Sequence, residues 1–355
     1  MRQMFDSTVE RLFADLASPA AVLECEGGIG PYSWPQAMWD AVEESGFPLA
    51  LAPESLGGAG ASWADVCGVV RLAGRFNLPL PLPEAMLANW LLGVAGLAPA
   101  EGAVSVAGSG SLRLRGGLVS GEAVDVPWGD AVPFVVAVTG GAEPAVLLLP
   151  TEAARRQDSA NIAAEPRASL LFQEVAPVAQ APLPTGWPTD VLLLGGAMVR
   201  AAQIAGAMEA VLAMATQYAG ERVQFGKPIG SFQAIQHQVA ILAEQTAAAV
   251  MACEAAFAAA EPRIVRLQAI AAKICASEAA GVGASVAHAV HGAIGFTHEH
   301  SLHLTTRRLW SWRSEFGSAT AWSQRLGRAV CAAGAHGFWP GVTEAHFDTL
   351  REQRA

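Results

Sequence analysis

The sequence predicts a mainly helical α+β fold, in which a small antiparallel β domain separates an N-terminal helical domain from a C-terminal four-helix bundle. Residues 1–100 carry helical stripes broken by Gly and Pro. Residues 101–187 hold short Val- and Leu-rich runs between clusters of Gly, Pro, Asp and Ser, which is typical of strands. Residues 188–355 contain long Ala-rich segments with wide apolar faces, so we expect three domains with these limits.

In the first domain, residues Met1–Leu16 mix charged and apolar residues at helical spacing. A second apolar stripe is formed by Trp34, Met38 and Val42, and Gly46 follows as a stop signal. Ser62 is the expected N-cap of a further helix, with Asp65 in its first turn. The alternation of Leu and Pro over residues 78–83 predicts an extended linker.

The other two domains show different periodicities. Strands are expected over Val104–Ala107, Pro133–Val138 and Ala145–Leu149. Long helices are expected over Leu192–Tyr218, Phe232–Ala260 and Arg263–Val290. Helices this apolar normally pack in a bundle, often across a subunit interface.

Composition excludes several classes of protein. With 355 residues, 52% of them hydrophobic, the chain can bury a large core. Its formal net charge of −10 argues against nucleic-acid binding. The five Cys lie far apart without a CxxC pair, which favours neither disulfides nor zinc and suits a reducing cytoplasm. No signal peptide opens the chain and its apolar stretches fall short of a membrane span, so we expect a soluble protein.

Residues 218–240, YAGERVQFGKPIGSFQAIQHQVA, predict a junction between two helices. One helix should end near Glu221, Gly226 and Pro228 should form a turn, and the next helix should begin near Ser231. Arg222 stands where a helix C-terminus favours a cation. An Arg, an aromatic ring and a helix N-terminus in one loop suit a pyrophosphate.

This junction resembles the signature R-x-Q-F-G-x-P-I-x-x-F-Q-A-I-Q-H-x-L-A of the acyl-CoA dehydrogenase family. In that family the loop reaches into the neighbouring subunit and binds its FAD. The resemblance implies FAD contacts from Arg222, Gln224, Phe225, Ile229, Phe232 and Ile235. It also implies an acyl-CoA substrate, and a homo- or hetero-oligomer, dimer or tetramer, with FAD at the subunit interface.

A second segment, Val290–Glu299, resembles the family turn Q-x-x-G-G-x-G-F-T-x-E that covers part of the flavin. Gly292 and Gly295 allow the backbone to approach a ligand closely. The resemblance implies cofactor contacts from Gly292 and Ala293. Two departures, Ala289 for the family Gln and Ala293 for the second Gly, are expected to weaken contacts to the pyrophosphate.

Two shorter matches extend the resemblance over nearly the whole chain. Arg307 and Arg308 stand where the family has an Arg-Arg helix, and otherwise read as a salt-bridged face. Residues Leu51–Gly60 resemble the family loop P-E-x-x-G-G-x-G. No strand leads into this loop and no Lys follows it, so it is not a nucleotide-binding loop.

The resemblance breaks at the catalytic base. In the family, a Glu removes the α-proton of the thioester while the flavin takes the β-hydride. The usual Glu belongs to a Y-E-G-T motif, which aligns with Glu315–Ser318 and places Phe316 at the Glu position. Ser318 aligns with the flavin-contacting Thr, and Thr320 is a further expected cofactor contact. The alternative family position for the Glu falls near Gly196, with no acid beside it.

Glu315, one residue out of register, is therefore the candidate base in this chain. Glu299 is a poorer candidate, because its family counterpart is structural. The family segment T-E-P-x-x-G-S-D is also missing from Pro99–Gly110.

Five His side chains cluster near the second segment: His288, His291, His298, His300 and His303. Their spacings straddle a Gly turn, so we expect no metal site.

Three functions remain open. The first is an FAD-dependent acyl-CoA dehydrogenase that acts alone with an unusual base. The second is a non-catalytic partner subunit of a heteromeric acyl-CoA dehydrogenase. The third is a flavin oxidase or monooxygenase on the same fold. Flavin content of the isolated chain separates the second from the others, and oxygen reactivity of the reduced flavin separates the third from the first.

Overall fold

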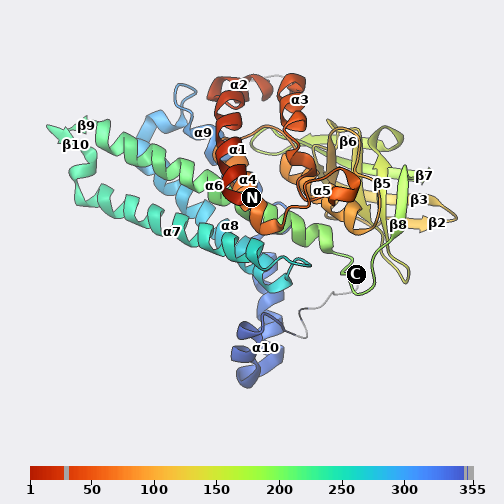
Figure 1. Cartoon of the computed structure of the whole chain (residues 1–355). Helices are drawn as coiled ribbons and strands as arrows, with labels where there is room; N and C mark the ends of the chain where they lie inside the picture. The colour runs from red at the N-terminus through yellow and green to blue at the C-terminus, as the bar shows by residue number, and fades with distance from the viewer. Residues whose placement is uncertain (28–31, 348–349, 351–355) are drawn as a thin grey trace.

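The computed structural model describes residues 1–27, 32–347 and 350, and confirms a mainly helical α+β architecture (Figure 1). The strands gather at one end of the molecule, and the long C-terminal helices extend toward the other end (Figure 1). The N-terminal helices lie over the middle, against the long green helix α6 (Val191–Glu221).

The N-terminal part is helical, as expected. Its elements are α1 (Arg2–Leu16), α2 (Pro19–Cys25), α3 (Gln36–Glu44), η1 (Phe47–Leu49), η2 (Glu54–Leu56), α4 (Trp63–Arg75) and α5 (Leu82–Val94). The predicted cap at Ser62 is confirmed, because its side chain accepts from the Asp65 amide and the Asp65 carboxylate accepts in return. The prediction of an extended linker over residues 78–83 is partly wrong, because α5 begins at Leu82. A Pro is tolerated in the first turn of a helix, since a backbone N–H at that position would have no acceptor within the helix.

The middle part forms two four-stranded sheets. Its strands are β1 (Val104–Val106), β2 (Arg113–Arg115), β3 (Leu118–Pro127), β4 (Phe134–Val138), β5 (Ala145–Pro150), β6 (Arg155–Ala160), β7 (Pro166–Val175) and β8 (Ala179–Pro182), with η3 (Thr151–Ala153) before β6. The sheet orders are β1-β4-β5-β8 and β2-β3-β7-β6. The three predicted strands correspond to β1, β4 and β5, but β1 pairs with β4 in parallel rather than antiparallel fashion. The strands that the sequence did not predict include β6, which is exposed along its whole length and has no apolar run.

The C-terminal part contains the three predicted long helices. Its elements are α6, β9 (Val223–Gln224), β10 (Lys227–Pro228), η4 (Ile229–Ser231), α7 (Gln233–Ala258), α8 (Arg266–His291), η5 (Gly292–Phe296), α9 (Leu302–Trp312) and α10 (Ala319–Thr343). Helix α6 packs against α4, α7, α8 and α9, so it is the central helix of the fold. Helix α10 is kinked at Gly334, whose φ of 68° is not helical.

The expected domain boundaries at 100/101 and 187/188 fall in the connections between α5 and β1 and between β8 and α6. We keep these boundaries as proposed domain limits. Residues 348–349 and 351–355 of the expected third domain lie outside the described residues.

The expectation that the apolar stretches are too short for a membrane span is wrong. Helices α6, α7 and the segment Arg266–Phe296 are long and apolar enough to cross a membrane, by length and composition alone. In α6, 94% of the most apolar window is buried inside the fold, which accounts for its composition. In α7 only 28% of that window is buried, so this helix presents an apolar face that the described residues do not cover.

Two glycines allow α4 and α6 to cross at close range. A Cβ atom at Gly206 would lie 1.8 Å from the carbonyl oxygen of Arg71, and one at Gly74 would lie 2.0 Å from that of Gln203. Backbone atoms cannot move aside as a flexible side chain can, so the crossing requires glycine on both helices.

Replacing Gly206 by Ala should therefore force α4 and α6 apart and lower the free energy of unfolding by roughly 3 kcal/mol. The matched control is Gly220→Ala on the same helix, where an added Cβ meets no atom within 4 Å. That control should be neutral or slightly stabilising, because Ala favours helix over Gly. Thermal unfolding followed by circular dichroism measures both, and equal melting temperatures would contradict the close crossing.

Candidate functional site

The predicted cofactor residues around Arg222 form an exposed hairpin at the end of α6. After Arg222, strands β9 and β10 pair in antiparallel fashion, and the Arg222 carbonyl accepts from the Ile229 amide at 2.8 Å. The two turn residues, Phe225 and Gly226, have φ of 50° and 81°, as two-residue hairpin turns require. The hairpin projects from the far end of the molecule (Figure 1), and 91% of the Phe225 side chain is exposed.

Aromatic and charged groups surround the start of α7. The Phe232 ring lies edge-on to Phe225 at 6.1 Å, and Lys227 Nζ lies 4.4 Å from its centroid. The expectation that Ser231 caps α7 is wrong, because Ser231 Oγ instead donates to the Pro228 carbonyl. Helix α7 starts after Phe232 without a side-chain cap, which leaves its first amides available to an anion.

The other hairpin residues divide between solvent and core. Gln224 is exposed, Ile229 is buried, and Ile235 is half-buried against the main core. The two isoleucines therefore anchor the hairpin, while Gln224 and Phe225 point outward.

The second predicted segment lies at the same end of α6. Gly292, with a φ of 64°, ends α8 and opens η5, and Ala293 beside it is exposed. The Tyr218 ring of α6 stacks on His291 of α8 with centroids 4.6 Å apart. Since Tyr218 lies one helical turn before Arg222, the structure brings these two cofactor segments to one end of the bundle.

The third predicted group lies elsewhere in the molecule. Ser318 is the N-cap of α10, where its Oγ accepts from the Ala321 amide at 3.2 Å, and Thr320 is exposed in the first turn. Phe316 before it has a φ of 51°, and the Trp322 indole donates to the Phe316 carbonyl at 2.9 Å.

Phe316 packs against α6 near its N-terminus. Its ring fits against Gly196, where an added Cβ would lie 2.0 Å from ring atom Cδ1, and against Gly108, where the distance would be 2.6 Å. The family resemblance places the catalytic carboxylate either at the position of Phe316 or near Gly196. These two positions are in contact, and the phenyl ring of Phe316 fills the space between them. From Gly196 to Arg222, α6 runs for roughly 40 Å.

A small pocket of about 260 Å³ borders this ring. It is lined by Gly108, Ser109, Val124, Asp125, Pro127, Ser314, Glu315, Phe316 and Gly317. The lining comes from the β sheets and from the turn between α9 and α10, so the pocket lies between the middle and C-terminal parts of the chain.

Glu315, the candidate base, is held by two arginines. Its carboxylate lies 2.5 Å from Arg167 Nη2 and 2.7 Å from Arg200 Nε, and it accepts from Asn161 Nδ2 at 2.9 Å. Burial raises the pKa of this carboxyl, but the charges of Arg167 and Arg200 outweigh burial and lower the pKa to about 2. A carboxylate so well stabilised is a weak proton acceptor at neutral pH.

Glu315 belongs to a longer set of charges, which we call the buried ion chain. Its members, in order of contact, are Glu84, Arg200, Glu315, Arg167, Glu165, Arg308, Glu26 and Arg307. Arg200 Nη2 lies 2.6 Å from Glu84, and Arg308 Nε lies 3.2 Å from Glu165. Positive and negative charges alternate along this buried ion chain. Each charge therefore has a neighbour of opposite sign that offsets the cost of its desolvation.

The sequence alone did not identify most members of the buried ion chain. Arg200 is a single charge in the apolar stretch of α6, and Glu84 is a single charge in the fully buried face of α5. A single charged residue in an apolar helix needs a partner of opposite charge when it is buried, so such residues could have been identified from the sequence as members of buried ion pairs. Burial raises the pKa of Glu84, while Arg200 opposes that shift.

Lys273 holds the turn that carries Glu315. Its buried amine donates to the carbonyls of Trp312 at 2.7 Å and Arg313 at 3.0 Å, and to Ser277 Oγ at 3.1 Å. A cation at the C-terminus of α9 satisfies carbonyls that have no helical partner. Burial lowers the pKa of this amine to about 7.

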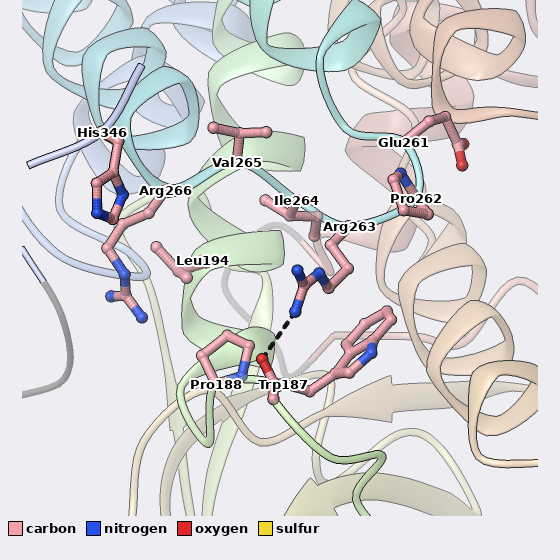
Figure 2. Close-up of a pocket in the computed structure, with 11 residues that line it drawn as sticks. Trp187, Pro188, Leu194, Glu261, Pro262, Arg263, Ile264, Val265, Arg266 and His346 are labelled. Atoms are coloured by element: carbon pink, nitrogen blue, oxygen red, sulfur yellow. Dashed lines mark hydrogen bonds between the residues drawn. The ribbon is translucent and has the colours of Figure 1, made fainter. Parts of the chain in front are cut away.

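A larger pocket, of about 730 Å³, lies between the start of α6 and the connection from α7 to α8 (Figure 2). Its two arginines already have partners: Arg263 donates to the Gly186 carbonyl at 2.8 Å, and Arg266 pairs with both oxygens of Asp190. None of the predicted catalytic or cofactor residues lines it. The chemistry expected from the sequence therefore has no part in this pocket.

Comparisons with known proteins agree with the family resemblance. Residues 192–319 match the family described as acyl-CoA dehydrogenase, C-terminal domain. Acyl-CoA dehydrogenase IpdE2 of Mycobacterium tuberculosis is 34% identical over 320 residues, which cover 86% of this chain and 90% of IpdE2.

Two solved structures share the fold. A variant of the Tcur3481-Tcur3483 steroid ACAD superimposes with a TM-score of 0.83 and 23% identity, covering 94% of this chain and 98% of that chain. The ChsE4-ChsE5 complex from Mycobacterium tuberculosis superimposes with a TM-score of 0.81 and 21% identity, with the same coverage of 94% and 98%.

Replacing Glu315 by Gln should destabilise the fold, because Arg167 and Arg200 then lose a shared negative partner. We expect a loss of roughly 3 kcal/mol in the free energy of unfolding, as for other broken buried ion pairs. Glu278→Gln, on the exposed face of α8, is the control and should change stability by less than about 0.5 kcal/mol. Urea denaturation measures both.

The pH dependence of the same variants follows from the lowered pKa of Glu315. The stabilisation is complete above pH 4.5, the ordinary pKa, and is lost as the pH falls toward 2. The wild-type chain should therefore lose more stability than Glu315→Gln over this window. Parallel stability curves would mean that the ion pairs at Glu315 carry no net energy.

Proposed function

This chain belongs to the acyl-CoA dehydrogenase family, and from that premise we propose that it serves as one subunit of a heteromeric acyl-CoA dehydrogenase. The assembly would oxidise an acyl-CoA thioester at its α,β carbons, with the catalytic carboxylate supplied by the partner subunit. One observation carries the proposal: Phe316 fills the contact with Gly196, where the family places its Glu, while Glu315 is held by Arg167 and Arg200.

The reaction needs a base, and the environment of Glu315 makes this residue unsuited to that role. A base that removes the α-proton works best when its pKa lies near the operating pH. The Glu315 carboxyl, with its pKa lowered to about 2 by the two arginines, is far from that range. We propose that Glu315 is an ion-pair partner in this chain and not the base.

FAD supplies the hydride acceptor in this chemistry. The residues of the hairpin fit the phosphate end of that cofactor, since Arg222 and Gln224 are exposed beside the uncapped start of α7. Gly292 and Ala293 lie at the same end of α6 and would add backbone contacts. Ile229, Phe232 and Ile235 would fix the hairpin against the bundle.

The length of α6 supports a composite site. Arg222 lies roughly 40 Å along the helix from Gly196, and FAD is too short to bridge that distance within one chain. The hairpin therefore serves a flavin held mainly by another subunit, whereas Ser318 and Thr320 would face a flavin at the opposite end. The apolar face of α7, which the chain leaves uncovered, is available for subunit contact.

Two observations favour a heteromer over a homo-oligomer. In this chain the Phe316 ring fills the space next to Gly196. A homo-oligomer would therefore have no carboxylate at either position where the family carries its catalytic Glu. Two structural neighbours carry names with two chains each, Tcur3481-Tcur3483 and ChsE4-ChsE5. The name steroid ACAD makes steroid-derived acyl-CoAs the first substrates to test, and we propose a cytoplasmic location.

A dehydrogenase that acts alone is the second candidate, and one observation favours it: Glu315 lines the pocket beside Phe316. The deciding experiment compares the chain purified alone with the chain co-expressed with a second acyl-CoA dehydrogenase from the same genome. We expect a colourless or unbleached chain alone, and an assembly whose flavin band bleaches under anaerobic acyl-CoA. A yellow chain that bleaches alone would contradict the heteromer, and fast reoxidation by oxygen would favour a flavin oxidase.

Replacing Arg222 or Phe225 by Ala should remove flavin from the assembly without unfolding this chain. Loss of a charge-assisted contact to phosphate should weaken FAD binding by roughly tenfold to a hundredfold. The melting temperature of the isolated chain should not change, because Phe225 is 91% exposed. Arg113→Ala, on the exposed strand β2, is the control and should keep the flavin. Equal flavin content in all variants would exclude the hairpin from the site.

A further inference from the structure

The five histidines form a packed group at the hairpin end of the bundle. Their rings come from the end of α8, the turn after η5, and the start of α9: His288, His291, His298, His300 and His303. The His291 ring lies between Tyr218 at 4.6 Å and His300 at 4.7 Å. His298 and His303 face each other at 5.1 Å, and His288 stacks on Phe296 at 4.2 Å.

Hydrogen bonds fix the tautomer of His291 and require His300 to be neutral. The Leu302 amide donates to His300 Nδ1 at 3.1 Å, so that nitrogen must carry a lone pair. His291 Nδ1 donates to the Ala287 carbonyl at 2.8 Å, which leaves His291 Nε2 unprotonated in the neutral ring. Among the described residues, His291 Nε2 has no hydrogen-bond partner, and the side chain is only 3% exposed.

A proton on either ring would be poorly stabilised. On His291 it would occupy a buried nitrogen without an acceptor, and on His300 it would break the bond from Leu302. No carboxylate in the described part of the chain forms an ion pair with these five rings.

The other groups around the pair offer no compensation. Helix α6 presents the Tyr218 ring, and α8 presents His288. The turn presents His298 and the exposed Glu299. Helix α9 presents His303, whose carbonyl accepts from Arg307, and the guanidinium of Arg307 is already paired with Glu26. Burial and the neighbouring histidines therefore disfavour a proton on either ring.

We propose that protonation of the His291–His300 pair loosens the Gly292–Phe296 turn and releases the flavin, so that cofactor binding at this end of the bundle is pH-sensitive. The inference rests on the proposed function, because η5 follows His291 directly and Tyr218 leads by one helical turn to the cofactor hairpin.

The direction of the pH effect follows from burial. Burial lowers the pKa of His291 and His300, and the neighbouring histidines lower it further. The unfolded chain takes up these protons near pH 6.5, before the folded protein does. Stability is therefore complete above this pH and declines as the pH falls below it. Under the proposal, flavin affinity declines in the same direction.

The test uses the assembly with its partner, freed of flavin and then titrated with FAD between pH 7.5 and 5.5. Protons taken up by the His291–His300 pair oppose flavin binding, so the dissociation constant of FAD should rise by more than about threefold at the acid end. In His300→Asn the amide oxygen keeps an acceptor for Leu302 but does not titrate, and the rise should be less than threefold. His336→Asn, exposed on α10, is the control and should behave as wild type.

A second measurement covers the case in which His300→Asn does not fold. Ring NMR of histidine-labelled wild-type chain should show three rings, those of His288, His291 and His300, that titrate below pH 6.5, the ordinary His value, together with shifts in residues 292–296. Rings that all titrate like an exposed histidine, or FAD binding that does not depend on pH, would overturn the inference and leave the proposed function intact. An assembly that binds no FAD at any pH would overturn both.

Discussion

Arg167 and Arg200 hold the Glu315 carboxylate between them, and through this contact the three parts of the chain meet in one buried ion chain. The N-terminal helices contribute Glu26 and Glu84, the β region contributes Glu165 and Arg167, and the bundle contributes the rest. Each member is held by a partner of opposite sign, so removal of one takes an ion pair from its buried neighbours, at a cost of roughly 3 kcal/mol. The fold thus has a structural use for Glu315, the acid that directly precedes Phe316.

Helix α6 separates the two groups of residues to which we assign cofactor contacts. At its N-terminal end, Gly196 accepts the Phe316 ring and leaves a pocket of about 260 Å³. At its C-terminal end, Arg222 and Phe225 stand exposed on a hairpin that nothing in the described chain covers. In the proposed assembly the hairpin would contribute to another subunit's flavin, and the Phe316 ring at Gly196 is the reason to expect that this subunit is a different chain.

Much of the fold could be predicted because its signals are local. Long apolar helices, the Ser62 cap and the Val-rich strands follow from periodicity and capping. Strand β6 could not be predicted, since an exposed strand is defined by its neighbour β7 and not by its own residues. The start of α7 was placed wrongly at Ser231, because that hydroxyl bonds to Pro228 in a 3₁₀ turn. For the site, motifs located the hairpin and the glycine turn, but the partners of Glu315 lie more than a hundred positions away and have no local pattern.

Native mass spectrometry of the complex purified from its own cells tests the central claim most directly, because it counts chains and flavins together. The account predicts an assembly that contains this chain, a second and different acyl-CoA dehydrogenase chain, and bound FAD. A homo-oligomer of this chain with one FAD for every copy would contradict the account.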